Sequence, residues 1–192
     1  MPTRRDRLRY GVRTLASTRN RLGSSKGGST GFPAGAGAVR AAGVRGIDHP
    51  YEGAFIGGTH HFALRVYFED TDVAGMVYYA NYLKFMERAR SDMLRCAGVD
   101  QRAAIEGGEG VYVVAEANIK YRAPARLDDN LVVLSEVIEV RAASCLIQQR
   151  VMRGHDVLTD AMVTAAFLSS EGRPKRQPRA WVDAFERLKK KG

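Results

Sequence analysis

The stretch from residue 65 to residue 94, RVYFEDTDVAGMVYYANYLKFMERARSDML, constrains the fold more than any other part of the chain. Its first residues are β-branched and aromatic, as at the end of a strand, and residues 70–76 (DTDVAGM) have the acidic side chains and glycine of a loop. Apolar residues then recur at helical spacing over residues 77–97, and Gly98 is a typical residue to end a helix. The stretch therefore predicts a strand, an acidic loop and a long helix in succession.

The remainder of the chain predicts mainly strands. Residues 111–123 alternate between apolar and polar side chains, as in a half-buried strand, and Pro124 ends the pattern. Three further strands, separated by short polar turns that favour antiparallel hairpins, are expected over residues 131–140, 144–153 and 156–169. With a first strand over residues 60–69, the pattern predicts an α+β fold in which a five-stranded antiparallel sheet wraps around one long central helix.

The basic residues are concentrated near the start of the chain. Residues 1–58 hold ten of the 30 Lys and Arg residues but only three of the 21 Asp and Glu residues, and they show no helical or strand periodicity. We therefore expect a disordered basic N-terminal extension over 1–58, a folded domain over 59–170, and a basic linker with a short C-terminal helix over 171–192. A solvated tail, an arm for an anionic partner and a transit peptide are all compatible with the extension.

Composition excludes several classes of protein. No apolar run is long enough to span a bilayer, and the N-terminus lacks the apolar core of a secretory signal. The extension shows no regular interleaving of basic and aromatic residues and no amphipathic face, so we expect no nucleic-acid partner. The two cysteines form no spacing pattern, which favours a reduced, cytoplasmic location over a disulfide framework.

Two acidic residues precede the helix, and they can be interpreted in two ways. Asp70 or Asp72 can cap the turn or the helix start, a structural role worth roughly 0.3–1 kcal/mol. Alternatively, one carboxylate can act beside unpaired backbone N–H groups of residues 77–79, which could hold a carbonyl oxygen as it becomes an oxyanion. Gly75 would allow a ligand to approach closely. This second interpretation favours hydrolysis of an activated ester, with the carboxylate as nucleophile or general base.

Other chemistries have weaker support in the sequence. A D-x-D phosphatase motif would need Thr or Val where Ala74 stands, followed by βαβ alternation that the chain lacks. Cys96 and Cys145 have no histidine nearby in sequence, so we expect both to be buried, inert thiols. Adjacent residues in a strand, such as His60 and His61, point to opposite faces and would not hold a metal together, so no metal site is expected.

The run VYFEDTDVAGMVYYANYLKFMERARSDML resembles the signature of the YbgC/4-hydroxybenzoyl-CoA thioesterase family, which has the hotdog fold. The resemblance extends over residues 62–169 and includes YRAPARLDDNLVV. It implies hydrolysis of an acyl-CoA to free acid and CoA, without a metal or other cofactor. It places the catalytic aspartate on Asp72, the oxyanion donor on the backbone N–H of Tyr79, and a structural role on Asp70. Many YbgC-like members have histidine where Tyr79 stands, so no imidazole role is carried over.

The resemblance also implies a homodimer or homotetramer with each site at a subunit interface. Substrate contacts are expected from Gly75, Val77, Tyr78, Tyr82, Lys120, Arg122 and Arg126. The three cations would meet the phosphates of CoA, although a solvated strand face explains them equally well. Tyr78, Tyr82 and Met86 would line an acyl pocket, or simply belong to the core. Two alternatives stay open: a thioesterase for acyl chains on acyl carrier protein, and a non-catalytic interaction protein of a cell-envelope complex.

Overall fold

The computed structural model describes residues 50–189. Most of the predicted N-terminal extension therefore lies outside the described residues. The strands are β1 (Ala54–Ile56), β2 (Thr59–Arg65), β3 (Val111–Tyr121), β4 (Asn130–Val140), β5 (Ser144–Arg153) and β6 (Asp156–Leu168). The helices are α1 (Asn81–Cys96), α2 (Gln101–Glu106) and α3 (Arg179–Leu188), with a single 3-10 turn, η1 (Phe68–Asp70).

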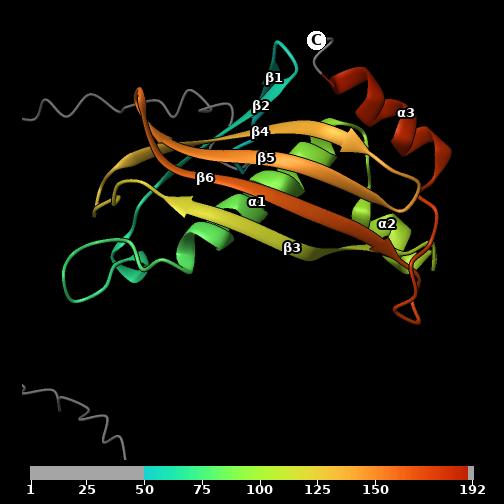
Figure 1. Cartoon of the computed structure of the whole chain (residues 1–192), viewed down its shortest axis with the longest axis horizontal. Helices are drawn as coiled ribbons and strands as arrows, with labels where there is room; N and C mark the ends of the chain where they lie inside the picture. Colours follow the sequence, from blue (N-terminus) through green and yellow to red (C-terminus); the bar gives the residue numbers. More distant parts are fainter. Residues whose placement is uncertain (1–49, 190–192) are drawn as a thin grey trace, which may run out of the picture. The chain divides into compact units, whose positions relative to one another are not determined.

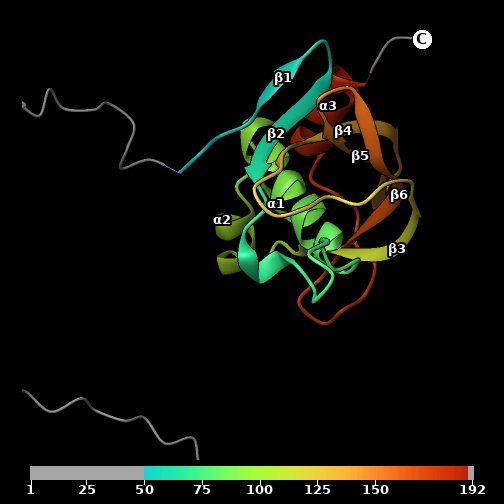
Figure 2. The same ribbon diagram turned by 90° about the vertical axis from the view of Figure 1, so that its left-hand side faces the viewer.

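All six strands form one antiparallel sheet in the order β1-β2-β4-β5-β6-β3. Figure 1 shows the sheet curving over α1, and in Figure 2 the helix is seen nearly end-on inside that curve. Register shifts at Val114/Glu116 in β3 and at Val137/Glu139 in β4 mark β-bulges, which increase the local bend of a strand. The predicted α+β architecture of a sheet around one long helix is confirmed.

The core lies between α1 and the concave face of the sheet. Alternate residues of β4, β5 and β6 are buried, as expected when one face of a sheet is covered. On the helix, Phe85, Met86, Ala89 and Met93 are almost completely buried at helical spacing, so α1 presents a wide apolar stripe to the sheet. The predicted C-terminal helix is present as α3, and its Trp181 packs edge-on against Phe167 at 5.6 Å.

The strand count differs from the prediction. Five strands were expected, but β1 adds a sixth within the part of the chain that was assigned to the disordered extension. With three residues, β1 is too short to show a period of two, and its pairing with β2 depends on a turn in which Gly57 and Gly58 both have positive φ. The ordered domain therefore begins before residue 59.

The start of the long helix also differs from the prediction. The apolar pattern placed it at residue 77, but α1 begins at Asn81. The backbone N–H groups of Val77 and Tyr78 bond instead to the carbonyl oxygens of Ala125 and Asp70, each at 2.9 Å. These contacts hold residues 77 and 78 outside the helix and attach the loop to the rest of the domain. No helix among residues 50–189 is both long enough and apolar enough to cross a membrane.

Candidate active site

Asp72 lies in a tight turn between η1 and α1. Its Oδ1 accepts hydrogen bonds from the backbone N–H groups of Ala74 (2.8 Å) and Met76 (3.3 Å), and its own N–H donates to the carbonyl of Met76 at 2.8 Å. Gly75 has a φ of 69°, a left-handed conformation that a glycine adopts without steric cost. Within residues 50–189, the second carboxylate oxygen of Asp72 has no hydrogen-bond partner. The exposed Asp72 side chain is thus held by one oxygen and free to react through the other.

The backbone N–H of Tyr79 is an unused donor beside this turn. Of the three N–H groups predicted to be unpaired, those of Val77 and Tyr78 are hydrogen-bonded, so that part of the prediction is wrong. The N–H of Tyr79 has no acceptor among the described residues. Tyr79 lies just before α1, where the first backbone donors of a helix have no intrahelical partner. Of the three N–H groups predicted to be unpaired, the one that the family resemblance assigns to the oxyanion is thus the one without an acceptor in the described structure.

Asp70 has a different environment from Asp72. Its side chain is buried, and its Oδ2 accepts a hydrogen bond from the N–H of Tyr67 at 2.9 Å. Its carbonyl oxygen accepts from the N–H of Tyr78 and from the side-chain amide of Asn81, both at 2.9 Å. Asp70 thus joins η1 to the start of α1, and these contacts support the structural role expected for it.

Asp72 and Tyr79 line the same open groove. Its other lining residues are Met76, Val77, Tyr78, Tyr82, Tyr121, Arg122, Ala123 and Pro124. The ring of Tyr121, at the end of β3, stands edge-on to Tyr79 at 6.4 Å and to Tyr82 at 5.7 Å, and its hydroxyl donates to the carbonyl of Tyr79 at 3.3 Å. Tyr121 was not singled out from the sequence, where its only signal was its place on the apolar side of an alternating strand.

The predicted substrate-binding residues do not all gather at this groove. Val77 and Tyr82 line it but are largely buried, and the Tyr82 hydroxyl accepts a hydrogen bond from the N–H of Ala125 at 2.8 Å. Tyr78 is about half exposed at the groove. Met86 is fully buried, so it belongs to the core and does not line this groove. Gly75 is not among the residues that line the groove; its left-handed conformation instead shapes the turn that holds Asp72.

The three predicted cations are also dispersed. Arg122 lines the groove but pairs with Asp160 at 3.2 Å. Lys120 lines a separate hollow formed by β3, β5 and β6. The exposed guanidinium of Arg126 has no ion-pair partner within the described part of the chain, and the Arg126 backbone bridges to Met76 beside the Asp72 turn. Arg122 and Arg126 are thus near the groove, whereas Lys120 belongs to another surface.

The two cysteines also differ from each other. Cys145 is buried, and burial raises the pKa of its thiol to about 11, which fits an inert residue. Cys96 was expected to be buried as well, but it is exposed near the C-terminal end of α1. That expectation is wrong because the apolar stripe of α1 faces the sheet and Cys96 lies outside it.

A sheet wrapped around one long helix is the hotdog arrangement, and the groove with its carboxylate and backbone N–H suits a thioester hydrolase. Comparisons with known proteins agree. The Thioesterase superfamily model matches residues 74–159. The acyl-CoA thioesterase YbgC of Haemophilus influenzae is 41% identical, with 67% of this chain and 95% of that protein covered. The acyl-CoA thioester hydrolase YbgC of Escherichia coli O157:H7 is 36% identical, covering 64% of this chain and 92% of that one.

Solved structures show the same relationship. A probable thioesterase from Bartonella henselae is 35% identical, with 62% of this chain and 99% of that one covered and a TM-score of 0.60. The chain therefore belongs to the YbgC family of the Thioesterase superfamily, and its hotdog fold is confirmed.

Proposed function

We propose that this enzyme hydrolyses the thioester of an acyl-CoA to a free acid and CoA in the groove formed by Asp72 and Tyr79. The observation that carries the proposal is that the groove offers one free carboxylate oxygen and one free backbone N–H. The similarity to proteins named acyl-CoA thioesterases supports the choice of substrate. Arg122 and Arg126, which lie near the groove, supply positive charge for the phosphates of CoA.

In the proposed mechanism, the thioester carbonyl oxygen accepts a hydrogen bond from the N–H of Tyr79. Charge that develops on this oxygen in the transition state is stabilised by that donor, which is fixed in place by the fold before the substrate arrives. Because Tyr82 and Tyr121 hold the segment around Tyr79, little reorganisation is needed. The backbone donor works with tyrosine at position 79 as well as it would with histidine.

Asp72 supplies the second half of the mechanism. As general base, its free oxygen takes a proton from water while the water oxygen attacks the carbonyl carbon, and the proton then passes to the departing CoA thiolate. As nucleophile, the same oxygen attacks the carbonyl, expels CoA thiolate and leaves an acyl-enzyme anhydride that water hydrolyses. In both versions the backbone N–H groups of Ala74 and Met76 orient the carboxylate.

The direct test is release of thiol from a panel of short, long and aromatic acyl-CoAs, followed with DTNB. We expect Asp72→Asn to lower kcat at least about 100-fold on the preferred substrate. Asp156→Asn, at the exposed aspartate that begins β6, is the matched control and should keep its activity. If Asp72→Asn retains activity, the mechanism is wrong although the enzyme class stands. If the wild type cleaves no acyl-CoA, thioesters of acyl carrier protein become the substrate to test.

We also infer that the enzyme works in the cytoplasm as a homodimer or homotetramer in which β3 lies at the subunit interface. Both cysteines of the chain are unpaired, as in a reduced compartment. β3 is an edge strand of 11 residues, most of them exposed, whereas the opposite edge, β1, has only three. A long exposed edge favours pairing with another strand. Since Tyr121 ends β3 and lines the groove, such a partner would lie beside the active site.

A further inference from the structure

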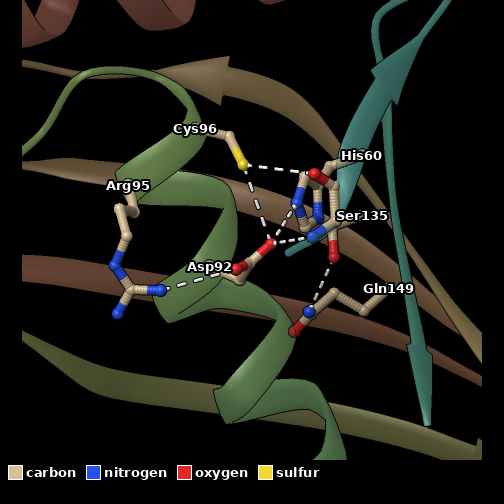
Figure 3. A network of polar contacts seen from close by, with 7 residues as sticks. His60, Asp92, Arg95, Cys96, Ser135 and Gln149 are labelled. Atoms are coloured by element: carbon tan, nitrogen blue, oxygen red, sulfur yellow. Dashed lines mark hydrogen bonds and ion pairs between the residues drawn. The ribbon is translucent and has the colours of Figure 1, made fainter. Parts of the chain in front are cut away.

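A second polar cluster lies near the C-terminal end of α1, whereas the Asp72 groove lies at its start. Figure 3 shows His60 of β2 together with Asp92 and Cys96 from the last turns of α1, their side chains pointing toward one another. Nε2 of His60 is 3.0 Å from Oδ2 of Asp92, and Sγ of Cys96 is 3.7 Å from the same oxygen. The three atoms all lie within 4.8 Å of one another.

The donor atoms of this cluster are those that bind zinc-like ions. Imidazole nitrogen, carboxylate oxygen and thiolate sulfur hold a tetrahedral ion at about 2.0–2.3 Å, which sets neighbouring donors roughly 3.3–3.7 Å apart. The 3.0 Å between Nε2 and Oδ2 is slightly below that range, and the 3.7 Å between Oδ2 and Sγ is at its upper end. Asp92 and Cys96 are one helical turn apart on α1, so the helix itself holds their side chains together. Small side-chain rotations would therefore suffice to enclose an ion.

The histidine is in the form that ligates metals. The His60 side chain is completely buried, and burial disfavours the charged form of an imidazole. The carboxylate beside Nε2 favours a ring proton on that nitrogen, and Nδ1 has no hydrogen-bond partner in the described structure. No bond is therefore lost at Nδ1 when the proton moves there and frees Nε2 for an ion.

The surroundings of the cluster provide charge and access. Oδ1 of Asp92 accepts a hydrogen bond from Nη1 of Arg95 at 3.4 Å. The other carboxylate oxygen, Oδ2, faces His60 and Cys96. Oδ2 also accepts a hydrogen bond from the N–H of Gly53 at 2.8 Å, and the carbonyl oxygen of Gly53 lies 3.5 Å from Sγ of Cys96 as a further oxygen donor. His60 and Asp92 are buried but Cys96 is exposed, so an ion can enter from the thiol side.

We propose that His60, Asp92 and Cys96 form a binding site for a divalent transition-metal ion of the zinc class, with the carbonyl of Gly53 or a water molecule completing the coordination. The ion would join β2 to the end of α1 and so stabilise the fold far from the chemical step. Binding requires the Cys96 thiol to lose its proton, because the thiolate is the form that ligates a metal ion. The affinity should therefore fall as the pH is lowered.

The test is titration of the full-length protein with Co²⁺, whose complexes with thiolates absorb strongly in the near ultraviolet. We expect a charge-transfer band that saturates at one ion per chain and disappears when Zn²⁺ is added. Cys96→Ser should abolish the band and weaken Zn²⁺ binding at least tenfold in competition with a chelating indicator. Cys145→Ala, which removes the other cysteine, is the matched control. It should keep the charge-transfer band and the wild-type affinity for Zn²⁺.

The proposal is overturned if the wild type gives no thiolate band, or if Cys96→Ser binds Zn²⁺ as tightly as the wild type. Cys96 is exposed near a helix end, so its replacement by serine should leave the fold intact, which circular dichroism checks. The readout involves no thioester, and Cys96→Ser should hydrolyse acyl-CoA at the wild-type rate. The metal site and the proposed enzymatic activity can therefore fail independently of each other.

Discussion

At the scale of single residues, the hydroxyl of Tyr82 fixes the turn that faces the Asp72 loop. It accepts a hydrogen bond from the buried N–H of Ala125, whose carbonyl in turn accepts from the N–H of Val77. Tyr82→Phe would leave the Ala125 N–H buried without a partner, and we expect a loss of about 1–3 kcal/mol in the free energy of unfolding. Urea denaturation of the wild type and the variant measures this loss in the free energy of unfolding. Tyr51→Phe is the control, since no hydrogen bond from the exposed Tyr51 hydroxyl is found in the described structure, and equal losses in both variants would contradict the explanation.

His60 gives the protein a defined pH dependence. Its pKa is lowered in the folded state from the ordinary value of 6.5, chiefly by burial. Below pH 6.5 the unfolded chain therefore binds a proton that the folded chain does not. The free energy of unfolding decreases as the pH is lowered from 6.5 to the folded-state pKa of His60. The slope approaches about 1.4 kcal/mol per pH unit for one proton.

Urea denaturation between pH 7.5 and 5 tests this linkage. The wild type should lose stability over that interval when metal is absent, whereas His60→Gln should show a shallower dependence. His155→Gln, at an exposed turn, should retain the wild-type slope. A His60→Gln variant with the same slope as the wild type would assign the effect to other groups.

The residues that could be predicted from the sequence are those joined by local geometry. Asp72 and Tyr79 follow one another through a loop and a helix start, so the local pattern limited the candidates to two carboxylates and three N–H groups, and the family resemblance selected one of each. Tyr121 is distant in sequence and reaches Tyr79 only because the turn after β3 packs on the Asp72 loop. In the same way, Cys96 meets His60 only through the packing of α1 on β2, which sequence spacing does not reveal.

At the scale of secondary-structure elements, β1 depends on one close approach to α1. A Cβ atom at Gly53 would lie 2.7 Å from both Oδ2 of Asp92 and Nε2 of His60, and 2.5 Å from the carbonyl of His61. Gly53→Ala must therefore push the segment before β1 away from the sheet and break the Gly53–Asp92 hydrogen bond. We expect a loss of about 1–3 kcal/mol, as for other overpacked sites.

Thermal denaturation compares Gly53→Ala with Gly107→Ala, at the end of α2. Gly107 has a negative φ and its Cβ would meet only the carbonyl of Ala103, at 3.1 Å, so a smaller loss is expected there. Similar losses would show that the contact with Asp92 and His60 is not what holds Gly53 in place.

The elements that were misplaced from the sequence share one physical cause. The strands and α1 were found because they are long enough for apolar periodicity to stand out, and the burial patterns of β4 to β6 follow it. By contrast, β1 and the segment before α1 are set by tertiary hydrogen bonds, to β2 in one case and to Ala125 and Asp70 in the other. Contacts of this kind leave no period in the sequence.

At the scale of the whole molecule, the long exposed edge of β3 predicts self-association. Ala117 is exposed near the middle of β3, and a lysine there would oppose edge-to-edge pairing with a second copy. Ala54→Lys, also exposed but on the short opposite edge, is the matched control. We expect sedimentation velocity to show an oligomer for the wild type and Ala54→Lys, and a shift toward monomer for Ala117→Lys. Because β3 ends at the groove, the monomer should also hydrolyse acyl-CoA more slowly. A wild type that sediments as a monomer would show that the chain does not self-associate. An Ala117→Lys variant that stays associated would show that the interface lies away from β3.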